Sequence, residues 1–238
     1  MNIIALIPAR YEATRFSGKL MAVLGKKTVI RTTYDATVAT GLFHKVIVVT
    51  DSDIIYNEII SHGGKAVMSR KEHESGSDRI AEAATDMEAE LIVNVQGDTP
   101  FVKKESLEKL LKQFDDPSVQ VASMMQELKE QKDIDDPNFV KVVTDKNNNA
   151  LYFSRNVIPY PRNSAIPITY YAHIGVYAFR KQALLNFTNR AITPLEDAEK
   201  IECLRYLEHG IPLRMILVDY MGIEIDTPED LERAAKLI

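Results

Sequence analysis

Three cations stand close together near the start of the chain, in the segment IPARYEATRFSGK. They are Arg10, Arg15 and Lys19, and they follow the apolar run IIALI. Arginine offers a planar fork of donors and lysine a mobile point charge, and both pair strongly with phosphate oxygens. The segment matches neither G-x-x-x-x-G-K-[ST] nor G-x-G-x-x-G, which disfavours a Walker ATPase and a common dinucleotide-binding dehydrogenase. The spacing predicts either a clamp for a polyphosphate or three unrelated surface cations.

Two aspartates elsewhere in the chain are candidates for holding a metal ion. Asp98 follows the apolar run ELIVNVQ, and Asp226 precedes a predicted helix that Thr227 and Pro228 begin. Carboxylate oxygens suit Mg²⁺, which usually keeps water and substrate phosphates among its ligands. The alternatives are a turn aspartate at position 98 and, at position 226, an acidic group that complements the helix dipole.

Several other polar residues have both a structural and a functional interpretation. In HESGSDRIAE, Ser75 or Ser77 either caps the helix that follows or belongs to a loop that reads a base or a ribose. His173 in AHIGVY, taken singly, is interpreted as a core histidine. Glu199 and Glu202 lie three residues apart on one predicted helix, which is typical of a solvated face.

The pattern of apolar runs predicts the elements that position these residues. IIALI, KVIVVT and ELIVNVQ are typical of strands buried on both faces, and helical patterns separate them. This predicts an α/β fold with a mostly parallel central sheet and helices on both faces. Ligands of such sheets bind beyond the carboxyl ends of the strands, which favours the loops at 8–19, 51–53 and 96–100. The runs VQVASMMQ, FVKVVTD, ALYFSR and YYAHIGVYAF predict a smaller mixed α/β lobe at about 119–190, within a single domain of residues 1–238.

Composition limits the class of protein. Apolar and charged fractions of 45% and 26% are typical of a soluble globular chain, and a net charge of -5 disfavours general nucleic-acid binding. A single cysteine excludes an internal disulfide and fits a reducing compartment. The first apolar run is too short for a signal peptide, and none approaches the roughly 18 residues of a membrane span. We therefore expect a cytoplasmic protein with neither a nucleic-acid nor a membrane partner.

Eight blocks of the sequence, taken in order, resemble one known family. The blocks are IPARYEATRFSGK, SGSDR, VNVQGD, DPNFVKVVTD, ALYFSRNVIP, HIGVYAF, LEDAEKIECLRYLEHG and IDTPEDLERA. Together they resemble the CMP-Kdo synthetases, the 3-deoxy-manno-octulosonate cytidylyltransferases, over nearly the whole chain. The resemblance implies a fold of the nucleotide-diphospho-sugar transferase type, usually in a homodimer. It also implies that CTP and a 3-deoxy-2-ulosonic acid react with Mg²⁺ to give a CMP-sugar and pyrophosphate, for lipopolysaccharide biosynthesis in Gram-negative bacteria.

The resemblance also implies a role for each matching residue. Three cations are expected to bind the triphosphate: Arg10, Arg15 and Lys19. Together with Asp98, they are the predicted catalytic residues. The nucleotide-binding loop comprises Ser75, Gly76, Ser77 and Asp78. The sugar-side positions are Gln96, Arg155, His173 and Glu202. The metal carboxylates are Asp98 and Asp226, and the general base stays open.

Several positions depart from the usual pattern of this family. Ser77 replaces threonine, Thr99 replaces a glutamate, and Cys203 replaces a sugar-side amide. Glu224 stands where a glycine is usual, two residues before the metal aspartate. Glu224 could pair with an ammonium group on the sugar or could point into solvent. The acceptor is therefore either Kdo or its 8-amino derivative, 8-amino-3,8-dideoxy-manno-octulosonate.

Two rival interpretations remain open. One is a cytidylyltransferase for another acidic sugar, such as sialic acid. The other is a non-catalytic nucleotide-binding sensor, which would need the cationic loop but would have little need for both Asp98 and Asp226.

Overall fold

The computed structural model describes residues 1–12, 16–73, 75–163, 165–219 and 222–238. Its contacts divide the chain into two compact units. Unit 1 comprises Met1–Glu108, Ala178–Thr188 and Met221–Ile238, and unit 2 comprises Lys109–Tyr177 and Asn189–Tyr220. The expected single domain with a lobe at about 119–190 stays a prediction.

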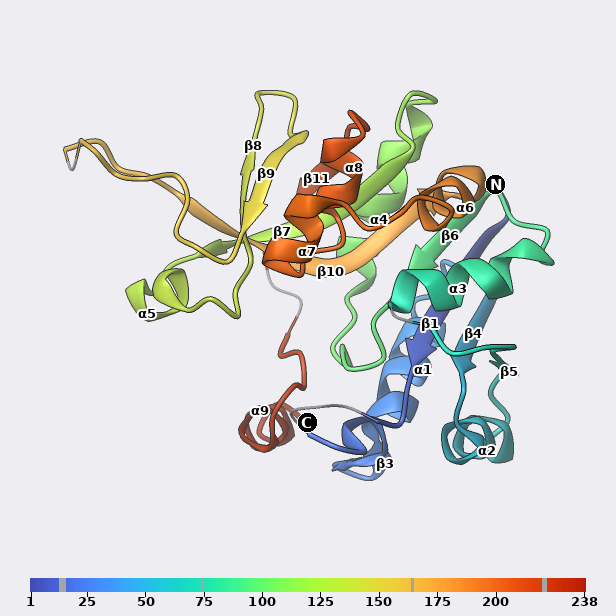
Figure 1. Cartoon of the computed structure of the whole chain (residues 1–238). Helices are drawn as coiled ribbons and strands as arrows, with labels where there is room; N and C mark the ends of the chain where they lie inside the picture. The colour runs from blue at the N-terminus through green and yellow to red at the C-terminus, as the bar shows by residue number, and fades with distance from the viewer. Residues whose placement is uncertain (13–15, 74, 164, 220–221) are drawn as a thin grey trace. The chain divides into compact units, whose positions relative to one another are not determined.

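Unit 1 is built on a parallel sheet with the strand order β6-β1-β4-β5 (Figure 1). Its strands are β1 (Ile3–Ala9), β4 (Lys45–Thr50), β5 (Ala66–Met68) and β6 (Leu91–Asn94). All but the first residue of β1 and all residues of β6 are buried, which explains their unbroken apolar runs. Short pieces follow β1, namely η1 (Lys19–Met21), β2 (Val23–Leu24) and β3 (Lys27–Thr28).

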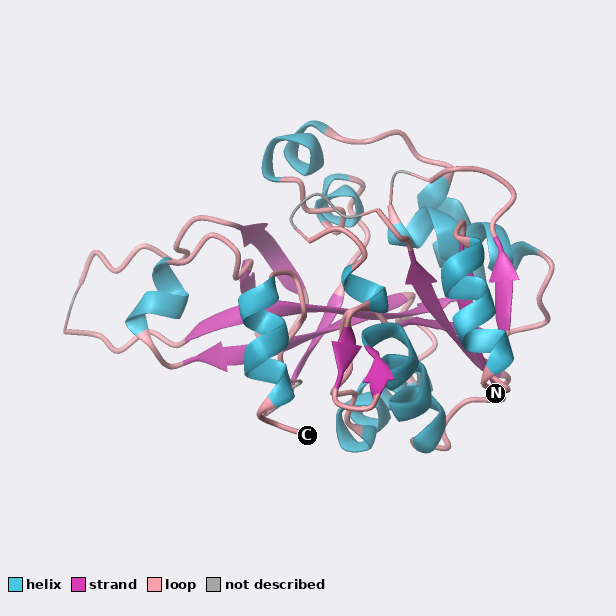
Figure 2. Ribbon diagram, turned by 90° about the horizontal axis from the view of Figure 1, so that it is seen from below, coloured by secondary structure: helices cyan, strands magenta, loops and turns pink. Residues whose placement is uncertain are grey.

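Helices cover both faces of this sheet (Figure 2). The helices that connect its strands are α1 (Val29–Ala39), α2 (Asp53–Ser61) and α3 (Gly76–Thr85). Crossovers between parallel strands are right-handed, so α1 and α2 lie on one face. Because the chain reverses direction between β5 and β6, α3 lies on the other face. The unit also contains α6 (Lys181–Thr188) and α9 (Pro228–Ala235), while α4 (Lys104–Lys112) crosses the boundary between the units.

Unit 2 has mixed strand pairing. Its strands are β7 (Val121–Leu128), β8 (Lys141–Thr144), β9 (Ala150–Ser154), β10 (Tyr170–Arg180, of which the last three residues belong to unit 1) and β11 (Arg214–Leu217). β11 pairs with β7 in parallel, whereas β8 pairs antiparallel with β9 and β10. The helical elements are η2 (Gln113–Asp115), α5 (Gln131–Asp135), α7 (Pro194–Glu199) and α8 (Leu204–Glu208). A buried ion pair of 2.5 Å between Arg205 and Glu196 joins α8 to α7.

The predicted α/β fold, with a mostly parallel sheet, helices on both faces and a smaller mixed part, is confirmed. The predicted helix start at Thr227 is confirmed as well, since it carries a capping box with proline in the first turn. Within the described residues, no helix has the length and apolar character that crossing a membrane requires.

Candidate active site

Two aspartates from distant parts of the chain meet at one lysine in unit 1. The Nζ atom of Lys19 lies 2.5 Å from Oδ2 of Asp98 and 2.7 Å from Oδ1 of Asp226. All three side chains are partly buried, with 15%, 22% and 33% of their surface exposed. Burial by itself lowers the pKa of Lys19, but the two carboxylates outweigh it and raise that pKa above its ordinary value. The ammonium group is therefore the counter-ion of both aspartates.

The backbone around Lys19 is fixed by the turn that precedes it. Gly18 has a φ of 68°, in the left-handed region that glycine adopts without strain, and it precedes the short helix η1. Leu20, the next residue after Lys19, is buried in the core. Lys19 thus stands on an anchored turn.

The two aspartates are tied to each other through the main chain. The amide of Ile225 donates to the carbonyl oxygen of Asp98 at 3.0 Å, which brings the segment before α9 alongside the loop after β6. Asp226 directly precedes Thr227, the N-cap of α9, whose hydroxyl accepts from the amide of Asp230 at 3.2 Å. These contacts hold both carboxylates toward the same point.

The donor set at this point fits Mg²⁺. The two carboxylates converge on one cation, and both supply the hard oxygen ligands that Mg²⁺ takes at about 2.1 Å. Among the described residues, no group of three or more His, Cys, Asp and Glu side chains is placed to hold a metal ion. The protein would therefore supply two carboxylates and leave the other positions to water and phosphate, as is usual for Mg²⁺.

Of the other two predicted phosphate-binding cations, the structure describes one. Arg10 directly follows β1 and is exposed, so it stands at the carboxyl end of the central strand. Arg15 lies outside the described residues, and its role stays a prediction.

The predicted nucleotide-binding loop forms the start of α3. Ser75 is the N-cap: its hydroxyl accepts from the amide of Asp78 at 3.1 Å and donates to the carboxylate of Asp78 at 2.9 Å. Ser77 is buried. A Cβ atom on Gly76 would lie only 3.1 Å from Cγ of Pro8 and 3.6 Å from Oε1 of Gln96. Glycine therefore lets the start of α3 approach the end of β1 and the predicted sugar-side glutamine.

A buried arginine holds this helix in place. Arg79 donates to Asp51 at 2.5 Å and to the hydroxyl of Ser69 at 2.9 Å. Since Asp51 follows β4, the ion pair ties α3 to the loop after that strand. Its partners give Arg79 a structural role.

Two polar groups at the end of β6 and in the loop after it are buried without a partner in the described part of the chain. Nδ2 of Asn94 and Oγ1 of Thr99 are buried and have no hydrogen-bond partner among the described residues. Buried polar groups are normally paired, so these two are candidates for a contact with ligand or water. The sequence carried one signal, because Asn94 is the only polar residue of the strand LIVN.

The remaining predicted sugar-side residues lie in unit 2. Arg155 follows β9 and donates to the main-chain oxygens of Glu199 at 2.8 Å and Pro137 at 3.1 Å. Glu202 is half-buried in the turn before α8, whereas Glu199 ends α7, so the prediction that the two lie on one helix is wrong. Cys203, beside it, is fully buried, and burial raises the pKa of its thiol.

His173 lies on β10, and its Nε2 atom is 2.9 Å from the hydroxyl of Ser123 on β7. Its ring contacts Phe153 edge-on, with centroids 5.1 Å apart, and Tyr177 at 5.3 Å. His173 is therefore packed among other side chains, as its interpretation as a core histidine predicts. Its role at the sugar stays a prediction.

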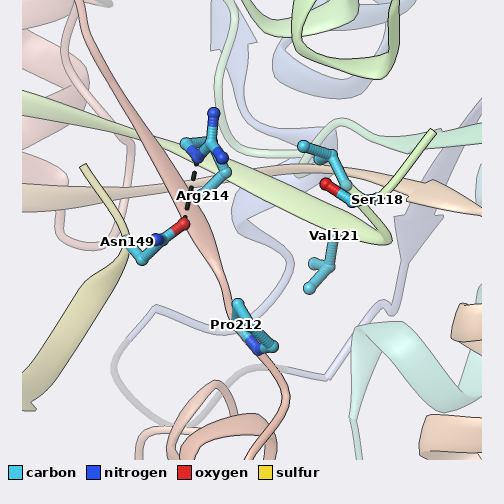
Figure 3. A pocket seen from close by; sticks show the side chains of 6 residues that line it. Ser118, Val121, Asn149, Pro212 and Arg214 are labelled. Carbon is cyan, nitrogen blue, oxygen red and sulfur yellow. Dashed lines mark hydrogen bonds between the residues drawn. The ribbon is translucent and has the colours of Figure 1, made fainter. Parts of the chain in front are cut away.

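A small cavity also lies in unit 2 (Figure 3). It measures about 180 Å³, and its lining is Ser118, Val119, Val121, Asn149, Pro212 and Arg214. Arg214 donates from Nε to Oδ1 of Asn149 at 3.0 Å. None of the predicted site residues lines this cavity.

We expect acid to destabilise the protein partly through His173. Burial lowers the pKa of His173 to about 4, whereas an unfolded histidine titrates near pH 6.5. Between these values the unfolded chain binds more protons than the folded one, so stability falls as the pH drops from about 6.5 to about 4. Because the side chain keeps partial exposure, we expect a loss of about 2 kcal/mol from this group.

Urea unfolding of the wild type and His173→Gln, each at about pH 7 and pH 4.5, measures this effect. The free energy of unfolding should fall by about 2 kcal/mol less in the variant. Equal falls in the two proteins would show that His173 does not titrate below its usual range.

Comparison with known proteins gives the family. The sequence pattern of the family described as "Cytidylyltransferase" matches residues 4–217. A 3-deoxy-manno-octulosonate cytidylyltransferase of Flavobacterium johnsoniae is 55% identical over 241 residues, which cover 100% of this chain and 99% of that protein. The enzyme of the same name from Christiangramia forsetii is 54% identical over 240 residues, with 100% and 97% covered.

One solved structure is similar over its whole length. It is described as CMP:2-keto-3-deoxy-manno-octonic acid synthetase complexed with CTP, and the similarity has a TM-score of 0.94 at 36% identity. It covers 100% of this chain and 98% of that one, which confirms the fold type that the resemblance implies. The chain therefore belongs to the cytidylyltransferase family, and within it to the 3-deoxy-manno-octulosonate cytidylyltransferases.

Proposed function

We propose that this protein couples CTP to a 3-deoxy-manno-octulosonate sugar, giving the CMP-sugar and pyrophosphate for lipopolysaccharide biosynthesis. The observation that carries the proposal is the convergence of Asp98 and Asp226 on Lys19. A nucleotide-binding sensor has little need for two carboxylates at one point. A phosphoryl-transfer enzyme needs them, because the charge of a triphosphate must be neutralised during the reaction.

We further propose Mg²⁺ as the cofactor, held by Asp98 and Asp226. When bound, the ion supplies positive charge to the phosphate oxygens. Lys19 then no longer has to neutralise the two aspartates, and its ammonium group can pair with phosphate instead. Lys19 and Arg10 would together bind the charge that develops on the phosphate oxygens during transfer.

The other residues have roles that follow from their chemistry. The amides at the start of α3 are suited to hold the cytidine, and Ser75, Gly76, Ser77 and Asp78 form the loop that carries them. The guanidinium group of Arg155 is suited to the sugar carboxylate, with which arginine pairs in a forked geometry. The 2-hydroxyl of the sugar attacks the α-phosphorus and pyrophosphate leaves in line, so no covalent enzyme intermediate is needed.

We propose Kdo as the acceptor rather than its 8-amino derivative. Recognition of the amino sugar would depend on Glu224, and this side chain is exposed. Water screens an exposed carboxylate, so pairing with an ammonium group there would discriminate only weakly between the two sugars.

Pyrophosphate release tests the reaction and the acceptor together. The protein is incubated with CTP, Mg²⁺ and, in separate reactions, Kdo, its 8-amino derivative and sialic acid, with UTP in place of CTP as the nucleotide control. We expect turnover with CTP and Kdo. Turnover only with sialic acid would contradict Kdo as the acceptor. CTP binding without turnover of any sugar would favour a non-catalytic nucleotide-binding sensor.

A homodimer and a cytoplasmic location complete the proposal. Both come from the family resemblance and from composition, and the buried free thiol of Cys203 fits a reducing compartment. Both remain predictions.

A further inference from the structure

One serine hydroxyl in unit 2 has three polar neighbours. Oγ of Ser123, on β7, lies 2.9 Å from Nε2 of His173, 3.1 Å from the carbonyl oxygen of Ile174 and 2.9 Å from that of Val176. Ser123 is completely buried. Its hydrogen bonds therefore have to be made with these neighbours.

The number of protons decides how these contacts are made. A serine hydroxyl has one proton to donate and two lone pairs to accept with, whereas a carbonyl oxygen can only accept. If Ser123 gave its proton to His173, its lone pairs would face two carbonyl oxygens at 2.9 and 3.1 Å without any proton between them. The favourable arrangement directs the proton to the carbonyl oxygens and leaves a lone pair facing Nε2. That nitrogen must then be the donor.

We propose that Ser123 is a positioning residue that fixes His173 as its Nε2–H tautomer and leaves Nδ1 as a hydrogen-bond acceptor for a hydroxyl of the sugar. The tautomer follows from the geometry of unit 2 alone, whereas the contact with the sugar rests on the proposed function. Among the described residues, no hydrogen bond to Nδ1 is found, so this nitrogen is available to a ligand.

Two observations support a neutral and fixed ring. Burial lowers the pKa of His173 to about 4, so the imidazole is uncharged at neutral pH. Phe153 and Tyr177 pack against the ring and restrict its rotation. A neutral ring with a proton on Nε2 has its only lone pair on Nδ1.

This tautomer divides the recognition of the sugar between two residues. A lone pair can accept from a hydroxyl group but repels a carboxylate. His173 therefore reads a hydroxyl, and the carboxylate is left to a cation, for which Arg155 is the predicted residue. The opposite tautomer, or a protonated ring, would be a donor and would suit the carboxylate instead.

The tautomer can be read directly by ¹⁵N NMR of histidine side chains in the wild-type protein without substrates. The chain has 5 histidines, so comparison with the spectrum of His173→Gln identifies the signals of His173. We expect Nε2 to be protonated and Nδ1 to be unprotonated at neutral pH. A proton on Nδ1, alone or together with one on Nε2, would overturn the proposal whichever sugar the enzyme uses.

Ser123→Ala tests the positioning role. Without the serine oxygen, a proton on Nε2 would be buried and unpaired, so we expect the tautomer to shift toward Nδ1–H. The KM for the sugar should then rise about tenfold while the KM for CTP stays unchanged. Ser118→Ala, at an exposed serine shortly before β7, is the matched control and should change neither.

Ser123→Thr keeps the hydroxyl and should retain both the tautomer and the KM for the sugar. An unchanged tautomer and KM in Ser123→Ala would contradict the role of Ser123. If Ser123→Ala fails to fold, the wild-type spectrum still decides the tautomer. If no sugar is turned over, only the proposed contact between His173 and the sugar is contradicted. The tautomer is still decided, because the spectrum is recorded without substrates.

Discussion

Replacing Asp226 by asparagine is expected to lower kcat for CMP-sugar formation by about 10³-fold. Asparagine has the same shape and leaves the capping box of Thr227 and Asp230 intact, so the fold should be preserved. The amide carries no charge, so the proposed Mg²⁺ site loses one of its two carboxylates. CTP binding should weaken much less than turnover, because the variant keeps the proposed contacts of Arg10 and Lys19 with the triphosphate.

Steady-state pyrophosphate release with saturating CTP and Kdo gives kcat, and calorimetry gives the affinity for CTP. Glu229→Gln is the matched control: it removes an exposed charge three residues further along the chain and should leave kcat unchanged. A kcat for Asp226→Asn within about tenfold of the wild type would contradict the role of Asp226 in transfer.

Replacing Lys19 by methionine should have two separate consequences. The first is a fall in kcat of about 10³-fold, because the cation proposed to stabilise the developing charge is lost. The second is a change in stability in the absence of metal, because Asp98 and Asp226 lose their shared counter-ion. Removing one member of a buried ion pair leaves an uncompensated charge. These groups are only partly buried, so we expect a loss of about 1–2 kcal/mol in the free energy of unfolding.

Adding Mg²⁺ should restore much of this stability, since the ion would take the place of the ammonium group between the two carboxylates. Urea unfolding with Mg²⁺ and with a chelator measures both effects. Lys27→Met is the control, because Lys27 pairs with Asp35 at 2.6 Å on the exposed surface and should contribute less than about 1 kcal/mol. The free energy of unfolding of Lys19→Met could instead equal that of the wild type and not respond to Mg²⁺. That result would show that Lys19 is not the counter-ion of the two aspartates.

The elements of the fold could be predicted from sequence because their signals are local. An unbroken run such as IIALI reflects burial of a strand on both faces, and TPLED and TPEDL carry the residues that begin a helix. The family could likewise be inferred from sequence, because its eight blocks keep their order and their residue types.

The tertiary structure alone decided which polar groups meet. Lys19 is separated by 79 residues from Asp98 and by 207 from Asp226, and nothing in their spacing reveals that one ammonium group contacts both carboxylates. Ser123 and His173 are 50 residues apart, and their contact depends on which strands are neighbours in the sheet.

Residue type gives the chemistry a side chain can perform, whereas its partners depend on distances that only the folded chain sets. The buried and unpaired groups of Asn94 and Thr99 illustrate this limit, because burial and pairing are properties of packing. The sequence by itself determined the buried strands, the start of the last helix and the family. The meeting of Lys19 with its two aspartates, and the direction of the hydrogen bond at His173, followed from the way the strands and loops pack.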